Sequence, residues 1–310
     1  MRHRLELSPE TTVVGFIDKA LPPVLTVDSG DIVEFQTGSI GGDRVTPTTT
    51  LDELIDYLHE RAPRAGAHTL TGPIAVNGAE PGQVLRVDVL ALEPREHGYN
   101  FQLPLRMNKG LLAEDFPEGR LTHYRHNLET MTVDICPGVR IPLKPFLGIV
   151  AVAPDADGPH HSVPPGPHGG NMDLPEVRVG ASVYLPIRTD GALFYAGDAH
   201  STQGDGEVCT SAIETAFSSA EVRLEVVDRG PLVRPRVETD DLWITLGLHE
   251  DLLEASRQAV RDMIRLLGEE YSIGPEDAYT VCSATVDLSI TQIVNGTRGV
   301  HASLPKSIFT

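Results

Sequence analysis

Alternating apolar and polar residues mark the first third of the chain. The stretch PPVLTVDSGDIVEFQTGS (22–39) alternates around DSGD, and GPIAVNGAEPGQVLRVDVLALEP (72–94) alternates around GAEPGQ. In the second stretch Leu85, Val87 and Val89 recur at period two, which places them on one face of a strand. The pattern therefore predicts strands joined by tight turns.

Two segments show helical spacing instead. Thr50 and Glu53 form a capping-box signature ahead of apolar residues at helical intervals: Leu51, Leu54, Ile55 and Leu58. The stretch HEDLLEASRQAVRDMIRLLGEE (249–270) carries an apolar stripe made of Leu252, Leu253, Val260, Met263, Ile264 and Leu267. A short helix and one long helix near the C-terminus are predicted.

The remaining segments complete a β-rich picture. Residues 95–165 are interpreted as loop-rich, and 155–173 as too rich in Pro, Gly and His for regular structure. Further strands are predicted at 146–153, 181–187, 191–197, 220–227 and 278–294. We expect an α+β, β-rich fold of two packed sandwich-like or barrel-like halves with a few helices. The predicted domains are an N-terminal β-rich one (1–155) and a C-terminal α+β one (156–310).

Composition narrows the class of protein. The chain has 310 residues, 29 glycines, 24 prolines and a formal net charge of −19, which argues against nucleic acid or an anionic membrane as partner. No signal-like or membrane-spanning apolar run occurs. The three cysteines, Cys136, Cys209 and Cys282, are few, odd in number and far apart, so a disulfide scaffold is not expected. These features predict a cytoplasmic protein with buried thiols.

Candidate chemistry concentrates in GDAHSTQGDGE (197–207), between two apolar segments. Asp198, His200 and Glu207 are metal-ligand types, and Asp-x-His directs two side chains to one face of an extended strand. The alternative is a polar hairpin turn that uses Gly-Asp-Gly for positive φ. Gln203 and Glu207 are not preferred turn residues, which favours a metal or catalytic role.

Two other clusters are less specific. His68 precedes one predicted strand and Glu80 lies in the turn after it. The structural interpretation is strong here, because Glu-Pro-Gly is a common turn sequence and a lone histidine is more often structural. The stretch PHGGNMD (167–173) brings His168, Asn171 and Asp173 around two glycines. Their backbone amides can approach a ligand or an oxyanion, or the glycines can simply turn a flexible loop.

A nucleophilic cysteine has little support. Cys209 lies in EVCTSAIETA, an apparently buried segment, and free cysteines are mostly inert when buried. The chain has no GxSxG, HExxH, Walker A or GxGxxG motif. The NGT sequon at 295–297 is interpreted as without meaning because no secretion signal accompanies it. Metal-assisted chemistry is the preferred hypothesis.

Several blocks together resemble the acetamidase/formamidase family. They are AHTLTGPIAVNGAEPGQVLRVDVL, IPLKPFLGIVAVAP, PPGPHGGNMD, GALFYAGDAHSTQGDGEVCTSAIETA and ATVDLSITQIVN, in the family's order. The resemblance implies a β-rich fold, a metal-dependent amide hydrolase and homo-oligomerisation as a dimer or larger assembly. Two departures stand out: Asp43 is either displaced from the family's early acidic position or unrelated to it, and residues 95–130 match only loosely. The choice among formamide, acetamide and a larger amide therefore stays open.

The resemblance also gives the site hypothesis. We expect the protein to bind a divalent metal, preferably zinc with calcium as the alternative, and to act on a small amide. The predicted metal ligands are His68, Asp198 and His200. The predicted catalytic residues are Glu80, Glu207, Asn171 and Gln203, with Glu207 or Glu80 as the base. The predicted substrate-binding residues are His168, Gly169, Gly170 and Asp205.

Two alternatives remain at this point. One is a non-catalytic metal-binding or small-molecule-binding protein of the same fold, because a fold does not guarantee chemistry. The other is an amidase with Cys209 as nucleophile, which would be indifferent to chelators.

Overall fold

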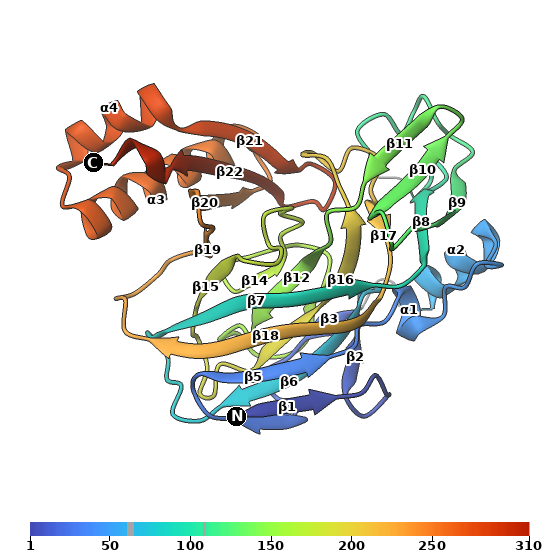
Figure 1. Ribbon diagram of the computed structural model, residues 1–310, viewed down its shortest axis with the longest axis horizontal. Helices are drawn as coiled ribbons and strands as arrows, with labels where there is room; N and C mark the ends of the chain where they lie inside the picture. Colours follow the sequence, from blue (N-terminus) through green and yellow to red (C-terminus); the bar gives the residue numbers. More distant parts are fainter. Residues whose placement is uncertain (61–64, 108–109, 310) are drawn as a thin grey trace.

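The computed structural model describes residues 1–60, 65–107 and 110–309. Figure 1 shows a β-rich molecule with a helical pair, α3 and α4, at one end. In the described residues most strands belong to two nine-stranded sheets. The β-rich α+β fold with a few helices and one long C-terminal helix is confirmed.

The first sheet collects strands from the whole length of the chain. Its order is β1 (Arg2–Leu5), β5 (Asp31–Phe35), β18 (Phe217–Val227), β7 (Val84–Pro94), β15 (Ser182–Pro186), β19 (Arg236–Glu238), β20 (Leu242–His249), β22 (Arg298–Pro305) and β21 (Asp287–Gln292). β1 runs parallel to β5, whereas the other neighbours are antiparallel. β21 therefore forms one edge of this sheet.

The second sheet carries the candidate chemistry. Its main path is β14 (Gly169–Asn171), β12 (Phe146–Val152), β16 (Phe194–Thr202), β17 (Ile213–Glu214), β8 (His97–Gln102) and β9 (Arg120–Arg125). β6 (Thr69–Val76) pairs with β16 and also with β2 (Thr12–Val14) and β4 (Leu25–Val27). Two small hairpins pair β10 (Thr132–Cys136) with β11 (Val139–Pro142), and β13 (His160–His161) with β3 (Phe16–Ile17).

The main core lies between the two sheets. Alternate residues of β7 and β18, such as Val87 and Leu224, join Leu147 and Phe194 of the second sheet in one buried cluster. Ile149 and Tyr195 point to the other side and pack in a separate cluster. Every residue of β12 and β16 is consequently buried. A central strand covered on both faces is a rigid base for a functional group.

The helices follow the expected local signals. In α2 (Leu51–His59) the Thr50 hydroxyl accepts a hydrogen bond from the Glu53 amide, and the Glu53 carboxylate accepts one from the Thr50 amide. In α3 (Leu252–Tyr271) the Asp251 carboxylate caps the first turn by accepting from the Glu254 amide. α3 and α4 (Pro275–Thr285) pack over β20 and β22 in a cluster of their own. The remaining helical pieces are α1 (Ile40–Asp43) and η1 (Lys306–Ile308).

Three expectations from the sequence are wrong in detail. The apparent strand 278–294 divides into α4 and β21, because Pro275 begins a helix whose buried stripe is Ala278 and Cys282. β16 begins three residues later than the predicted strand, since Ala192 and Leu193 adopt left-handed turns. The thiols are not all buried: Cys136 is exposed and Cys209 is half-buried.

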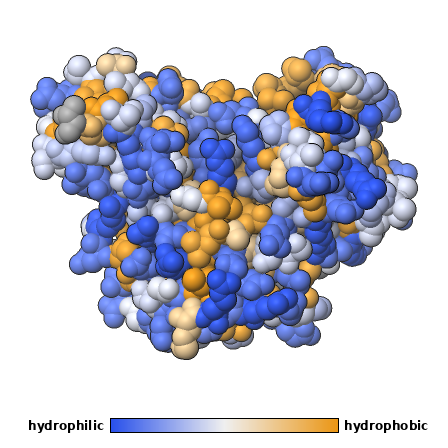
Figure 2. All heavy atoms as spheres, in the orientation of Figure 1, coloured by the Kyte–Doolittle hydropathy of each residue, from blue (hydrophilic) through white to orange (hydrophobic). Residues whose placement is uncertain are grey.

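The proposed division at residue 155 stays a prediction, and both large sheets contain strands from either side of that residue. Among the described residues, no helix is both long and apolar enough to cross a membrane. The face seen in Figure 2 is largely hydrophilic, with a strip of hydrophobic residues down its middle.

Candidate metal centre

The buried strand β16 places Asp198 and His200 side by side. The Asp198 Oδ2 to His200 Nε2 distance is 3.3 Å, and the two residues are 9% and 1% exposed. Residues i and i+2 of a strand face the same side, as the Asp-x-His pattern predicts. His200 pairs with Phe146 of β12 and with Glu214 of β17, and its ring meets the Phe146 ring edge-on. The imidazole is therefore fixed from two neighbouring strands.

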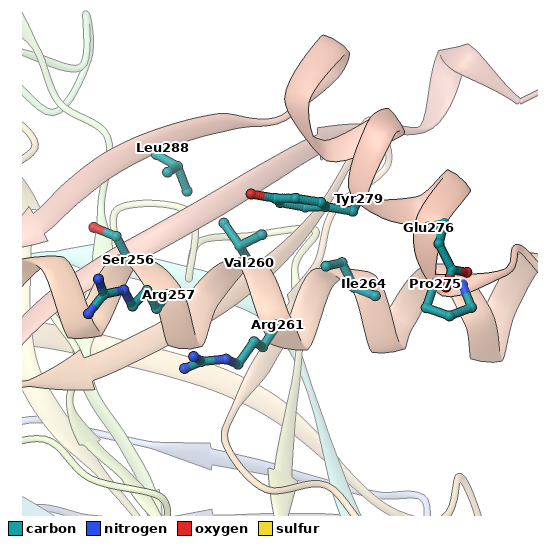
Figure 3. Close-up of a pocket in the computed structure, with 9 residues that line it drawn as sticks. All are labelled: Ser256, Arg257, Val260, Arg261, Ile264, Pro275, Glu276, Tyr279 and Leu288. Atoms are coloured by element: carbon teal, nitrogen blue, oxygen red, sulfur yellow. The ribbon is translucent and has the colours of Figure 1, made fainter.

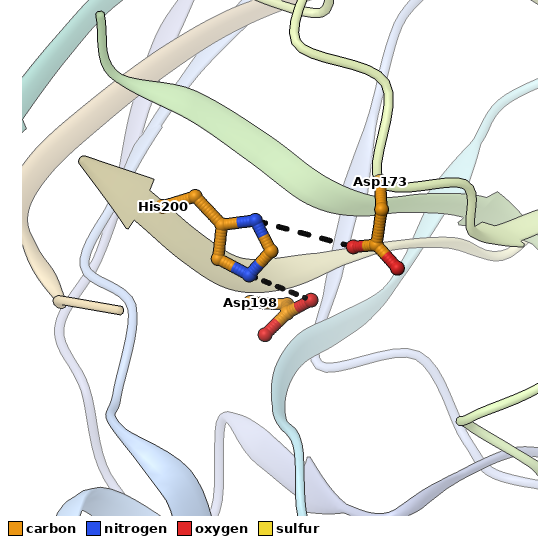
Figure 4. A group of neighbouring side chains, drawn as sticks. All are labelled: Asp173, Asp198 and His200. Carbon is orange, nitrogen blue, oxygen red and sulfur yellow. Dashed lines mark ion pairs between the residues drawn. The ribbon is translucent and has the colours of Figure 1, made fainter. Parts of the chain in front are cut away.

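Asp173 completes a compact group with these two residues. It follows β14, is fully buried, and its Oδ1 lies 4.0 Å from His200 Nδ1. One ligand atom from each of Asp173, Asp198 and His200 lies within 4.8 Å of the other two, as Figure 4 shows. The sequence placed Asp173 in the PHGGNMD block but not among the ligands. The structure thus brings two blocks of the chain onto one point.

Two glutamates add to the same group. Glu214 Oε2 lies 3.2 Å from His200 Nε2, and its other oxygen accepts a hydrogen bond from the Ala212 amide. Glu207 is 7% exposed, and burial, followed by the nearby Asp173 carboxylate, raises its pKa well above the ordinary value. Four buried carboxyl groups therefore surround one imidazole, and the cluster carries an excess of negative charge.

The excess of charge appears in the pKa values. Burial, helped by the Asp198 carboxylate, raises the pKa of Asp173 to about 8. Burial alone would raise the pKa of Asp198, but the imidazoles of His200 and His68 hold it at about 2. Burial alone would lower the pKa of His200, but the carboxylates of Glu214 and Asp198 raise it well above its ordinary value. The cluster thus favours cations and holds protons where no other cation is present.

The backbone at the cluster is strained. Asp173, Asp198 and Glu207 have φ values of 50°, 55° and 47°, in the left-handed region. Asp tolerates this region, whereas Glu has no such preference. Each non-glycine residue costs about 1–2 kcal/mol there. Such outliers collect at functional sites, where the surrounding structure holds them in spite of their conformational cost.

A close approach of backbone requires Gly148. A Cβ at this position of β12 would lie 2.8 Å from Asp173 Oδ1 and would also collide with Asp198 Oδ2. Any side chain would push the two carboxylates away from each other. The glycine in FLGIVAV therefore serves the cluster and not a turn.

The donor atoms fit a divalent cation. Among the residues that the structure describes, Asp173 Oδ1, His200 Nδ1 and Glu207 Oε2 are buried without a hydrogen-bond partner. The neighbouring Asn171 Oδ1 and Gln203 Oε1 are in the same condition. Each such atom costs about 1–3 kcal/mol if nothing satisfies it. Imidazole nitrogen with carboxylate oxygen is a set that zinc accepts, whereas calcium takes oxygen ligands.

Comparison with known proteins shows the family to which the chain belongs. The model of the Acetamidase/Formamidase family matches residues 16–161 and 156–310. The chain belongs to the acetamidase/formamidase family. An acetamidase from Bacillus halodurans is 30% identical, with a TM-score of 0.87 over 98% of each chain. An acetamidase from Yersinia enterocolitica is 27% identical, with a TM-score of 0.88 over 100% of this chain and 93% of that one.

Curated relatives match over a shorter range. The formamidase of Methylophilus methylotrophus is 26% identical over 247 residues, which is 63% of this chain and 60% of the relative. The chain spans between 50% and 63% of the length of the curated relatives it matches. The resemblance identified from the sequence is confirmed.

In this family member, several predicted site residues lie at or beside the cluster. His68 precedes β6, donates to or accepts from Ser162 Oγ at 2.8 Å, and lowers the pKa of Asp198. Gln203 donates from Nε2 to the Asp173 carbonyl. Asn171 is 3% exposed at the end of β14, two residues before Asp173. The roles given to His68, Gln203 and Asn171 stay predictions.

Other predicted site residues lie elsewhere. Glu80 is exposed in the turn after β6, and the carbonyl of its neighbour Ala79 accepts from the Gly191 amide, at the opposite end of β16 from His200. The structure does not bring Glu80 to the cluster, because eight strand residues separate it from His68. Asp205 is exposed, with its Oδ2 4.0 Å from His301 Nε2.

The PHGGNMD block divides between the cluster and its surroundings. The His168 ring lies near that of His160, and burial lowers the pKa of His168 to about 4. The Gly169 amide already donates to the Gly166 carbonyl, and both Gly169 and Gly170 have positive φ. These glycines turn β14 so that Asp173 reaches β16.

Cys209 has no base beside its thiol among the described contacts. Asn100 Nδ2 donates to Cys209 Sγ at 3.4 Å, and the thiol also approaches the Ser211 carbonyl. A thiol in these surroundings lacks the neighbour that would activate it. The inert interpretation of Cys209 therefore agrees with its contacts.

Sequence reasoning missed three residues of the cluster. Asp173 was visible in PHGGNMD, but its role as a ligand was not assigned. Glu214 lies in the apolar-looking segment CTSAIETA, and only its pairing with His200 marks it. Asn295 Nδ2 donates to Asp173 Oδ2 at 2.6 Å across 122 residues of sequence. No local sequence pattern predicts such a contact.

Proposed function

We propose that the chain is a metal-dependent amidase that hydrolyses a short aliphatic amide, of the formamide or acetamide type, to a carboxylate and ammonia. The observation that carries the proposal is the surplus of buried carboxylates around His200, with several ligand atoms left unpartnered. Family membership and relatives named acetamidase and formamidase support the amide as substrate.

The proposed metal ligands are Asp173, Asp198 and His200, with His68 as a further candidate. Zinc is the proposed ion because the set mixes nitrogen with oxygen. A divalent cation supplies Lewis acidity, which polarises a carbonyl and lowers the pKa of water. Glu214 holds His200 Nε2 through its carboxylate and so sets the orientation of the ring.

We assign proton transfer to Glu207. Its buried carboxyl has one oxygen without a hydrogen-bond partner among the described residues. In the proposed reaction Glu207 accepts a proton from the attacking water, and the C–N bond breaks as Glu207 returns that proton to the departing nitrogen. Asn171 is the proposed donor to the oxyanion through its side-chain amide, a contribution of about 3 kcal/mol per donor.

Metal analysis beside an amide panel tests the proposal. The purified protein is measured for bound metal and for ammonia release from formamide, acetamide and propionamide. Chelation with confirmed metal loss is expected to abolish ammonia release, and added Zn²⁺ to restore it. Full activity without metal would refute the metal role. Bound metal without ammonia release would identify a binding protein instead.

We also propose that the chain forms a homodimer through the face made by α3, α4 and β21. A cavity of about 600 Å³ lies there, and Figure 3 shows Tyr279 and Leu288 directed toward it. Tyr279 is 64% and Leu288 is 50% exposed. Arg257 on α3, which pairs with Glu254 at 3.2 Å within the chain, and Glu276 on α4 line the same cavity. A two-fold contact can also set the arginine of one copy against Glu276 of the other.

Light scattering tests this face. The double variant Tyr279→Glu, Leu288→Glu is expected to be monomeric, while the wild type is dimeric. Phe116→Glu is the control, because Phe116 is 57% exposed elsewhere on the surface. A monomeric wild type, or a dimer that survives the double substitution, would contradict the proposal.

We propose a cytoplasmic location because of the state of the cysteine thiols. All three cysteines are free and Cys136 is exposed, which suits a reducing compartment. Fractionation of the source cells tests this proposal, and recovery outside the cytoplasmic fraction would overturn it.

A further inference from the structure

The carboxyl group of Asp173 accepts a hydrogen bond from a side-chain amide at one of its two oxygens. Asn295 Nδ2 donates to its Oδ2 at 2.6 Å, and both residues are buried, at 6% and 0% exposed. Asp173 Oδ1 has no hydrogen-bond partner in the described part of the chain and faces His200 Nδ1 at 4.0 Å. The bond to Asn295 therefore decides which oxygen is left for a cation.

Asn295 is itself fixed from inside its turn. The fully buried Gln292 accepts at Oε1 from the amides of Val294 and Asn295, each at 3.1 Å. Its Nε2 donates to the Thr297 carbonyl at 2.7 Å. Gly296 has a φ of 79°, which lets the chain reverse toward β22. The turn between β21 and β22 is thus built around one glutamine and presents the Asn295 amide inward.

The same segment also anchors the Glu207 loop. The Gly206 amide donates to the Thr291 carbonyl at 3.0 Å, and the Ile293 amide donates to the Gly206 carbonyl at 3.1 Å. Gly206 directly precedes Glu207 in the chain. One turn of the C-terminal strand pair therefore holds two of the carboxyl groups of the cluster.

We infer that Asn295 is a positioning residue, which orients the Asp173 carboxyl so that Oδ1 is presented to the metal. This inference rests on the proposed function, because it presupposes that Asp173 is a ligand. Without the amide donor, the carboxyl group can rotate and lose its single preferred orientation. Partners that orient ligands in this way typically contribute about 10–100-fold to metal affinity.

Zinc affinity of the full chain tests the inference. Asn295→Ala is expected to weaken Zn²⁺ binding about 10–100-fold, measured by competition with a chromophoric chelator. Asn77→Ala is the matched control, since Asn77 Nδ2 donates to Asp28 Oδ1 at 2.7 Å on the surface. The control is expected to bind zinc like the wild type. The melting temperature of each metal-free variant is measured in parallel.

The outcomes separate the two claims. Wild-type zinc affinity in a folded Asn295→Ala protein overturns the positioning role. Should that variant not fold, Asn295→Leu keeps a side chain of similar volume without a hydrogen-bond donor, and wild-type affinity in it overturns the role equally. A wild-type chain that releases ammonia but binds no metal refutes the proposed function instead.

Discussion

Two buried aspartates of this molecule, Asp262 and Asp173, have opposite surroundings. Asp262 of α3 is 7% exposed and accepts hydrogen bonds from Arg234 at 2.8 Å and from Arg265 at 2.7 Å. Asp173 is fully buried and has one oxygen without a partner in the described residues. The first is a satisfied ion pair, whereas the second shares the single imidazole of His200 with other carboxylates.

The comparison teaches how to distinguish a structural acid from a functional one. Buried charge alone does not, since Asp88 is also buried and is paired with Arg86 and Arg223. The distinguishing feature is a group of carboxylates whose nearest cations are imidazoles and whose ligand atoms remain unpartnered. Such a group is stable only with protons or with an added cation.

The largest expected effect is on kcat, from a substitution that removes a charged group of the cluster. Asp198→Asn should lower kcat for the best amide about 10³-fold, or about 4 kcal/mol, because a charged group at the reacting centre is lost. Ammonia release measures the effect, and circular dichroism checks the fold. Asp262→Asn is the control and should keep kcat within a few-fold. Equal losses in the two variants would show that burial, not function, separates the aspartates.

For stability we expect the structural aspartate to matter more than the aspartate of the cluster, which is the reverse of the order expected for kcat. Asp262→Asn leaves Arg234 and Arg265 without a buried partner and should lower the free energy of unfolding by about 3 kcal/mol. Asp173→Asn in metal-free protein removes an uncompensated carboxyl and should raise it by about 1 kcal/mol. Urea unfolding of both metal-free variants measures the difference. A destabilised Asp173→Asn protein would make Asp173 an ordinary structural acid.

A smaller effect is expected at Gly148. Gly148→Ala adds a Cβ against Asp173 Oδ1 and should weaken zinc binding about 10-fold by displacing a ligand. Gly204→Ala is the control, because a Cβ there meets nothing within 4 Å. Isothermal titration with Zn²⁺ compares the two. Unchanged affinity in Gly148→Ala would mean that the carboxylates need no close approach.

The smallest effect concerns an imidazole that is not part of the carboxylate cluster. Burial and the neighbouring His123 lower the pKa of His97 to about 4. The unfolded chain binds this proton near pH 6.5, so its contribution to stability is complete above pH 6.5 and is lost as the pH falls toward 4. His97→Gln should reduce the loss of melting temperature between pH 7 and pH 5. An unchanged pH profile would exclude His97 as a source of acid sensitivity.

The predictable parts of this protein are those that depend on neighbours in sequence. The capping box at Thr50, the stripe of α3 and the alternation of Leu85, Val87 and Val89 arise from hydrogen bonds and periodicity within one element. Asp198 and His200 share a face for the same reason. Family resemblance added the amide chemistry, which no local pattern carried.

The tertiary structure decided the rest. Asp173 and Asn295 meet across 122 residues, and Glu214 reaches His200 only because β17 pairs with β16. It also left Glu80 in an exposed turn at the far end of β16. Periodicity states which face a side chain takes, but burial and the pairing of distant strands determine which charges face each other and which find no partner.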